Sequence, residues 1–220
     1  MKKMLLVMAA GTLFAAGTAQ ADTVTSVNVV GYYSVTIPSN RIALVTPVLE
    51  SFQAGTLEDL IGTQLPVGSF AYIWDRTSNG YISASRTARG GWGITNLILR
   101  GDAVWLKPAA GTPDVTVTFM GEVPGNYNVA ATTTVANISG IDAVGYGYPV
   151  DILWTNTALS QAVPDGSFLH VWTGTGYNSY SKTARGGWGT ANSLQIKAGQ
   201  AFWIQTSVPT DWEETVPYNL

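Results

Sequence analysis

Cysteine is absent from this 220-residue sequence, and only 11% of its residues are charged. Without cysteine the chain can form no disulfide, and thiol catalysis and thiolate metal ligation are excluded. The sequence also holds a single histidine, His170, which leaves too few ligands for a transition-metal site. We therefore predict no metal and no cofactor, and a fold held together by packing and backbone hydrogen bonds.

The scarcity of charge bears on the partners of the protein. An average soluble domain has roughly 25% charged residues, so this surface must be short of charge. Low charge weakens the repulsion between molecules, which favours packing against copies of the chain, other envelope proteins or polysaccharide. An ordinary monomer covered by Ser, Thr and Asn is the alternative. The formal net charge of −3 offers no basic surface, so no nucleic-acid partner is expected.

The apolar run at the N-terminus has the pattern of a secretory signal peptide. Lys2 and Lys3 form a positive segment, residues 4–17 are too few to span a bilayer, and Ala19-Gln20-Ala21 is a cleavage site. We predict an exported protein, located in the periplasm, at the cell surface or outside the cell. Cleavage leaves 220 − 21 = 199 residues starting at Asp22, with a net charge of −3 − 2 = −5. We expect no transmembrane helix in this mature chain.

One stretch of seven residues occurs twice. Residues 87–93 read Thr-Ala-Arg-Gly-Gly-Trp-Gly, and residues 183–189 repeat them letter for letter. Flanking matches follow in the same order: Gly68-Ser69-Phe70 with Gly166-Ser167-Phe168, Trp74 with Trp172, Gly80-Tyr81 with Gly176-Tyr177, and Trp105 with Trp203. We interpret the chain as a tandem duplication, with the signal peptide at 1–21, one β module at 22–121 and a second at 122–220. Since each copy is small for an independent core without disulfides, we expect the two to pack together.

The local patterns predict short antiparallel strands. In residues 70–74 aromatic side chains alternate with small or aliphatic ones, residues 168–172 repeat the pattern, and Asn-Gly at 79–80 indicates a hairpin turn. Residues 23–37 predict a strand pair or one bent strand. Thr-Leu-Glu-Asp at 56–59 has the spacing of a capping box, which indicates a helical turn. The expected fold is all-β: two homologous tandem modules of short antiparallel strands, sandwich or barrel-like, with one short helical turn per module.

The order of these motifs resembles that of the tandem β modules in uncharacterised exported proteins of gram-negative bacteria. The likeness covers nearly all of the mature chain, from a Pro-ended strand and a helix-like turn through Gly-Ser-Phe-x-x-x-Trp, Asn-Gly-Tyr, Gly-Gly-Trp and Gly-x-Ala-x-Trp to Thr-Phe-x-Gly-Glu-Val-Pro. Members usually carry Asn before the first Pro, where Thr46 and Tyr148 stand here. The resemblance implies export and an envelope or extracellular setting, and it carries no catalytic residue over.

The repeated Arg-Gly-Gly-Trp is the main candidate for ligand binding. Arg89 beside Trp92, and Arg185 beside Trp188, could form a stacking platform for a sugar ring or an anionic polysaccharide. Alternatively the glycines adopt positive φ in a tight loop, and each Trp folds back as a plug with Arg stacked on it. We favour the plug, because a large indole in a glycine-rich loop is most often an anchor.

Other aromatic and acidic residues give weaker signals. The paired tryptophans on the strands favour core packing or contact between the copies. Trp154 and Trp212 have no counterpart and are candidates for a feature particular to the second copy. His170, which replaces Tyr72 of the first copy, is expected to be an ordinary residue of an aromatic face. No Ser lies in a Gly-x-Ser-x-Gly elbow, and the copies' matching motifs share no acidic position, so we assign no catalytic residue.

These observations favour an exported, non-enzymatic structural or interaction protein of the cell envelope or extracellular matrix. A carbohydrate-binding protein that uses the Arg-Gly-Gly-Trp loops is the alternative. An enzyme acting on polysaccharide comes third.

Overall fold

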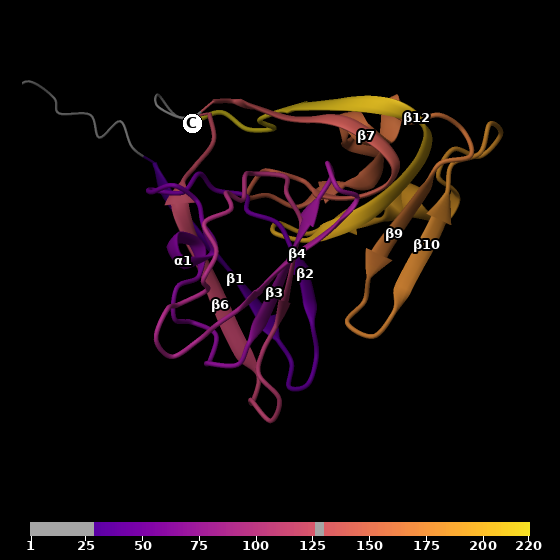
Figure 1. Cartoon of the computed structure of the whole chain (residues 1–220). Coiled ribbons are helices and arrows are strands. Elements are labelled where there is room, and N and C mark those ends of the chain that lie inside the picture. The colour runs from indigo at the N-terminus through magenta and orange to yellow at the C-terminus, as the bar shows by residue number, and fades with distance from the viewer. Residues whose placement is uncertain (1–28, 126–129) are drawn as a thin grey trace, which may run out of the picture.

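The structure is a computed structural model that describes residues 29–125 and 130–220 (Figure 1). The predicted signal peptide at 1–21 lies outside the described residues. The part of the expected strand region 23–37 that precedes residue 29 also lies outside them. Antiparallel strands dominate the described chain, and its helices are short. The all-β prediction is confirmed.

Up to Glu122 the described chain forms six strands and one helix: β1 (Val30–Ile37), β2 (Ala43–Val45), α1 (Leu57–Leu60), β3 (Phe70–Asp75), β4 (Gly80–Ser85), β5 (Val104–Lys107) and β6 (Val115–Glu122). From Thr132 it forms six more strands, one helix and two 3₁₀ turns: β7 (Thr132–Gly145), β8 (Ile152–Leu153), η1 (Trp154–Asn156), α2 (Ala158–Ala162), β9 (Phe168–Trp172), β10 (Tyr177–Ser181), η2 (Gly189–Ser193), β11 (Gln195–Ile196) and β12 (Ala201–Thr215). We refer to these two parts as the first and second halves.

Helix α1 begins as the sequence indicates. The Thr56 hydroxyl accepts a hydrogen bond from the Asp59 amide at 3.3 Å, and the Asp59 carboxylate accepts one from the Thr56 amide at 3.0 Å, which confirms the capping box. The second half has more helical turns than the single one expected, because the chain also turns beside the buried Trp154 and Trp188 to form η1 and η2. Within the described ranges, no helix is long and apolar enough to cross a membrane.

Two four-stranded antiparallel sheets lie at the centre of the molecule, in the orders β2-β5-β3-β4 and β7-β12-β9-β10. Their registers agree: Tyr72 lies between Ser83 and Trp105 on the neighbouring strands, and His170 holds the same place in the second sheet. In the first half β1 and β6 form a separate pair, whereas β7 and β12 run on as the long curved pair in Figure 1. The matching order and register support the interpretation as a tandem duplication, and the boundary at residue 121 stays a prediction.

Each half has its own hydrophobic core. In the first half the core lies between α1 and the inward side chains of the sheet, such as Ile73 and Leu106, and it includes Trp92. In the second half it lies between α2 and inward residues such as Phe202, and it includes Trp188. The alternation of strand residues thus turns one sheet face to the core and leaves the other face for contact between the halves.

Backbone hydrogen bonds join the two halves in equivalent pairs. The Thr46 amide donates to the Gly199 carbonyl at 3.0 Å, and the Gly145 amide donates to the Gly101 carbonyl at 2.9 Å. Thr46, directly after β2, holds the same place as Gly145 at the end of β7, and Gly101 and Gly199 hold the same place before β5 and β12. Each half gives and receives the same bond, as in a two-fold dimer. A Cβ atom at Gly145 would collide with the Thr46 side chain, so this crossing requires glycine.

Candidate binding groove

Tryptophans from both halves meet where the two sheets approach each other. Trp74 of β3 lies edge to face with Trp203 of β12, with ring centroids 4.8 Å apart and planes at 74°. Trp172 of β9 meets Trp105 of β5 in the same way, at 5.2 Å and 85°. The prediction that these four residues serve core packing or contact between the copies is confirmed, since each pair crosses from one half to the other.

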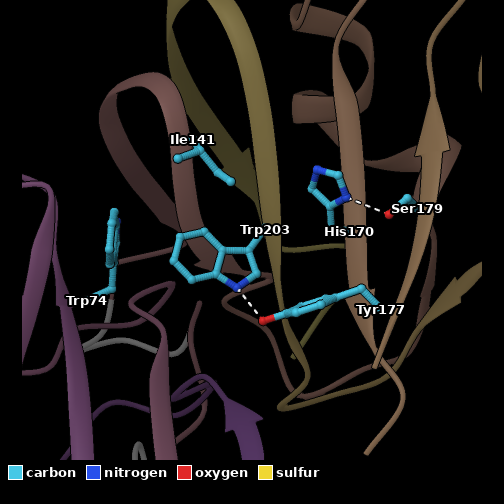
Figure 2. Close-up of a pocket in the computed structure, with 6 residues that line it drawn as sticks. All are labelled: Trp74, Ile141, His170, Tyr177, Ser179 and Trp203. Carbon is cyan, nitrogen blue, oxygen red and sulfur yellow. Dashed lines mark hydrogen bonds between the residues drawn. The ribbon is translucent and has the colours of Figure 1, made fainter. Parts of the chain in front are cut away.

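An open groove lies beside one of these pairs. It has a volume of about 390 Å³ and is lined by Trp74, Ile141, His170, Tyr177, Ser179 and Trp203 (Figure 2). We call it the aromatic groove. In Figure 2 Trp203 lies at the centre, with Trp74 on one side and Tyr177 and His170 on the other. The lining residues come from β3 of the first half and from β7, β9, β10 and β12 of the second, so the groove needs both halves.

Hydrogen bonds fix the aromatic walls of the groove. Trp74 Nε1 donates to Asp142 Oδ1 at 2.6 Å, and Trp203 Nε1 donates to the Tyr177 hydroxyl at 3.1 Å. Burial raises the pKa of Tyr177, so the hydroxyl keeps its proton at neutral pH. Because the Tyr177 oxygen already accepts the indole N–H, its own proton can be donated to a ligand. The rings are therefore held in place by the protein itself.

A partly buried ion-pair network lies behind Trp74. Asp142 is 3% exposed, and its Oδ2 lies 3.3 Å from Arg76 Nε. The same guanidinium reaches Asp102 Oδ1 at 3.1 Å. Burial raises the pKa of Asp142 to about 6, although the Arg76 charge and the Trp74 hydrogen bond act in the opposite direction. The network positions Trp74 and joins Arg76 and Asp102 of the first half to Asp142 of the second.

His170 and Ser179 form the polar side of the groove. They face each other across β9 and β10, with His170 Nδ1 2.7 Å from Ser179 Oγ, which leaves Nε2 for another partner. The imidazole stacks on Phe168 at 6.2 Å, as expected of a residue on an aromatic face. A Ser-His-Asp triad uses Nε2 for the serine and Nδ1 for the carboxylate. The bond through Nδ1 therefore does not have the geometry of such a triad.

Each residue of the aromatic groove has a counterpart at the equivalent position of the other half. The pairs are Trp74 and Trp172, Ile141 and Ile42, His170 and Tyr72, Tyr177 and Tyr81, Ser179 and Ser83, and Trp203 and Trp105. The internal hydrogen bond recurs as well, because Trp105 Nε1 donates to the Tyr81 hydroxyl at 3.0 Å. Five pairs are identical residues, and only His170 and Tyr72 differ.

The two repeated tryptophans of the Arg-Gly-Gly-Trp loops lie in the cores. Trp92 and Trp188 are 2% and 3% exposed, and their Nε1 atoms donate at 3.0 Å to the carbonyls of Gly62 and Ser160 respectively. Gly62 follows α1 and Ser160 lies in α2, so each indole binds the helical turn of its own half. An indole buried in this way has no open face for a sugar ring, and its position is the one expected of a plug.

The backbone of both loops is closed in the same way. In each, the threonine amide donates to the carbonyl of the second glycine, at 2.8 Å in the first loop and 2.7 Å in the second. These glycines, Gly91 and Gly187, have φ of 58° and 55°, in the left-handed region that favours glycine. Arg89 and Arg185 are exposed, and among the described residues neither guanidinium lies over an indole, so the expected stacking of Arg on Trp is not seen. A role of the loops in ligand binding stays a prediction. Because both indoles are buried, a ligand would have to be bound by the two arginines.

The two tryptophans without counterparts have packing roles. Trp154 and Trp212 are buried in the core of the second half, and Trp154 lies edge to face with Trp188 at 5.1 Å. Among residues 29–125 and 130–220, no cluster of three or more His, Asp or Glu side chains could hold a metal ion.

The aromatic groove is not predicted by any pattern in the sequence. The alternation in residues 70–74 and 168–172 predicts aromatic faces, but the groove arises only where Trp74 of one half meets Trp203 of the other. No local pattern specifies that contact. The one signal in the sequence is the replacement of Tyr72 by His170 within otherwise matching motifs.

In comparisons with known proteins, no protein-family model, no curated protein and no solved structure matches the chain. Any functional assignment therefore depends on the residues described above.

Proposed function

We propose that this protein is a non-enzymatic interaction protein of the cell envelope or extracellular matrix, exported by its predicted signal peptide, and that the aromatic groove is its binding surface. The observation that carries the proposal is the groove itself, whose walls are held by hydrogen bonds within the protein. Ligand sites usually combine apolar and aromatic walls with a few placed polar groups, as this groove does. The low charge of the sequence supports close association with other envelope material.

The acidic side chains with shifted pKa values support binding rather than catalysis, because each is engaged in a structural hydrogen bond. Asp59 caps α1, and Asp75 accepts hydrogen bonds from the turn between β3 and β4. Asp151 binds Lys197 and the amide of Ala198, and Glu214 accepts the Trp212 indole N–H. A glycosidase needs two carboxyl groups facing a substrate from either side. None of these side chains lines the aromatic groove.

A carbohydrate-binding protein is the second candidate. The observation that favours it is the aromatic groove rather than the Arg-Gly-Gly-Trp loops, whose indoles are buried. An enzyme acting on polysaccharide stays third, because the pair of Ser179 and His170 lacks the geometry of a triad.

Fractionation and rebinding test the proposal. Producing cells are separated into cytoplasmic, periplasmic, envelope and extracellular fractions, and the purified mature protein is then sedimented with washed envelope or matrix material. We expect recovery outside the cytoplasm and saturable co-sedimentation. Ile141→Lys places a charge in the groove at a residue that is 43% exposed, so this variant should fold normally and lose co-sedimentation.

The matched control is Val208→Lys, which adds the same charge at a residue that is 51% exposed and outside the groove lining. This variant should sediment as the parent does. Recovery in the cytoplasm, or equal sedimentation of the parent and Ile141→Lys, would contradict the proposal.

A further inference from the structure

We infer that the aromatic groove binds a neutral saccharide, one pyranose ring per chain, and that His170 determines which of the two equivalent positions in the molecule is the binding site. This inference rests on the proposed function, and it names the ligand class of the same groove.

The charges near the groove favour a neutral ligand. The six lining residues include no Asp, Glu, Lys or Arg. Arg76 and Asp142, behind Trp74, are bound to each other and to Asp102 or Trp74. A charged ligand would lose hydration on entering the groove without gaining an opposite charge, which is costly. This distinguishes the groove from an anion site of the kind expected for the loop arginines.

The distribution of polar atoms favours a ligand with one apolar face. Trp74, Trp203 and Ile141 provide aromatic and aliphatic walls, while His170 Nε2 and the Tyr177 hydroxyl proton have hydrogen-bonding capacity to spare. A pyranose ring has this pattern, because its C–H bonds can pack on an aromatic surface while its hydroxyls lie around the rim. Those hydroxyls need partners once water is displaced. His170 and Tyr177 can supply them.

The size and openness of the groove are compatible with a sugar unit of a longer chain. Its volume of about 390 Å³ lies within the range of roughly 300–1,000 Å³ that is common for small-molecule sites. Because the groove opens to solvent, further sugar units can extend away from the bound ring. Walls that the protein itself holds in place also spare a ligand the entropy cost of ordering them.

The counterpart of the groove differs at one residue, which in the aromatic groove is one of the two that can offer a hydrogen bond to a ligand. The other, Tyr177, is also a tyrosine in the counterpart. Tyr72 stands where His170 stands, and its ring approaches Tyr81 at 6.3 Å in a T-shaped contact. Tyrosine is larger than histidine and carries a hydroxyl beyond the position where the imidazole ends. The smaller His170 instead bonds Ser179 and leaves the space in front of Trp203 open. The two halves thus provide two equivalent positions, and the one in the second half has the shape that accommodates a ligand.

Titration of the full mature chain with defined sugars tests this inference. The probes are cellobiose, maltose and N,N′-diacetylchitobiose, with digalacturonate as the anionic comparison. Binding is followed by calorimetry and by the indole N–H signals in NMR spectra. We expect a neutral probe to bind with one site per chain and to shift the signals of Trp74 and Trp203, while those of the buried Trp92 and Trp188 stay in place.

Variants at the two equivalent positions sharpen the test. His170→Tyr gives the groove the residues of its counterpart, and it should weaken binding at least tenfold with an unchanged Tm. Tyr72→Phe, the control in the other half, should bind as the parent does. The inference would be overturned if no neutral probe shifted these signals, if His170→Tyr bound a neutral probe as well as the parent does, or if digalacturonate bound in the groove instead.

The two proposals fail in different ways. If Ile141→Lys abolishes co-sedimentation but no neutral sugar binds, the ligand class is wrong and the interaction function stands. If the parent protein does not associate with envelope or matrix material at all, the proposed function is wrong whatever the sugar titrations show.

Discussion

At the scale of single residues, the binding and packing interpretations of the loops predict opposite effects of replacing Trp92 or Trp188. Replacing either by alanine removes a buried ring and leaves the carbonyl of Gly62 or Ser160 without its donor. We expect the free energy of unfolding to fall by about 3–5 kcal/mol for each variant, whether or not a ligand is present. Denaturant unfolding of the two variants measures this loss.

Controls for this prediction lie in the same loops. Arg89→Ala and Arg185→Ala change exposed side chains, so the free energy of unfolding should change by less than about 0.5 kcal/mol. If Trp92→Ala and Trp188→Ala unfolded like the parent and lost binding to a polysaccharide, the indoles would be platforms and the plug interpretation would be wrong.

Asp142 should make the protein less stable as pH rises. Its pKa in the folded protein is raised to about 6 from an ordinary value of 3.8, mainly by burial. Between these values the folded state binds more protons than the unfolded state, so the free energy of unfolding falls with rising pH. Asp142→Asn removes this titration, and its stability should depend less on pH in that window. Denaturant unfolding between pH 4 and 7 compares the two proteins.

Other carboxyl groups with shifted pKa values provide the controls for the pH experiment. Burial also raises the pKa of Asp102 and Glu214, so part of the decline should persist in Asp142→Asn. Hydrogen bonds lower the pKa of Asp75, whose contribution to stability is lost only as the pH falls below its ordinary value. Asp75→Asn should therefore leave the decline in the higher window unchanged. If the free energy of unfolding of Asp142→Asn fell with rising pH as steeply as that of the parent, Asp142 would not be the cause of the decline.

At the scale of secondary-structure elements, the two halves are joined by the ends of β2 and β7. The chain crosses there at Thr46, directly after β2, and at Gly145, the last residue of β7, where each amide donates to a glycine carbonyl of the other half. The backbone hydrogen bond is made once in each direction, and the two residues at the crossing are a threonine and a glycine. Two threonines would not fit at this crossing.

Gly145→Thr should therefore destabilise the protein. The new side chain would collide with Thr46, and overpacking of this kind costs about 1–3 kcal/mol or more. Since the two residues hold equivalent places, the exchange variant Thr46→Gly with Gly145→Thr keeps one threonine and one glycine at the crossing. We expect it to recover most of the lost stability. Thermal melts of the parent, the two single variants and the double variant give a double-mutant cycle. A double variant no more stable than Gly145→Thr would show that the collision with Thr46 is not the cause of the loss.

At the scale of the whole molecule, each half completes its partner. The junction buries tryptophans from both sheets and repeats its backbone hydrogen bonds, so either half alone would expose Trp105 or Trp203 to water. These aromatic residues lie outside the two separate cores, and their burial contributes to stability only when the halves meet.

We accordingly expect residues 22–121 and 122–220 to be unstable when expressed apart. Each fragment should melt without a cooperative transition or far below the intact chain, and mixing the two should restore a cooperative transition. Thermal melts followed by circular dichroism test this. Cooperative unfolding of both separate fragments near the temperature of the intact chain would show that the junction adds little to stability.

The N-terminal pattern leads to a prediction about the native protein as a whole. Removal of residues 1–21 should give a chain that begins at Asp22 and is found outside the cytoplasm. Intact-mass measurement on material from producing cells gives the answer directly. A mass that still includes Met1 to Ala21 would overturn the argument for export.

Features that depend on neighbouring residues could be derived from the sequence alone. The capping box at Thr56 and Asp59, the aromatic alternation of β3 and β9, and the positive φ of the loop glycines follow from local geometry. The absence of cysteine likewise excluded disulfides without reference to any structure. These features involve residues a few positions apart, whose relation is set by backbone conformation.

The groove and its polarity were decided only by the tertiary structure. Trp74 and Trp203 become neighbours because two sheets from different halves pack together. The pKa of Asp142 is raised because the same packing buries its carboxyl group, and the neighbouring Arg76 only partly offsets this effect. The repeat predicts two halves with equivalent positions. Contacts between residues far apart in the chain decide which tryptophans are buried and where the groove opens. Such contacts are specified by the packing of the whole molecule, and no short stretch of sequence contains them.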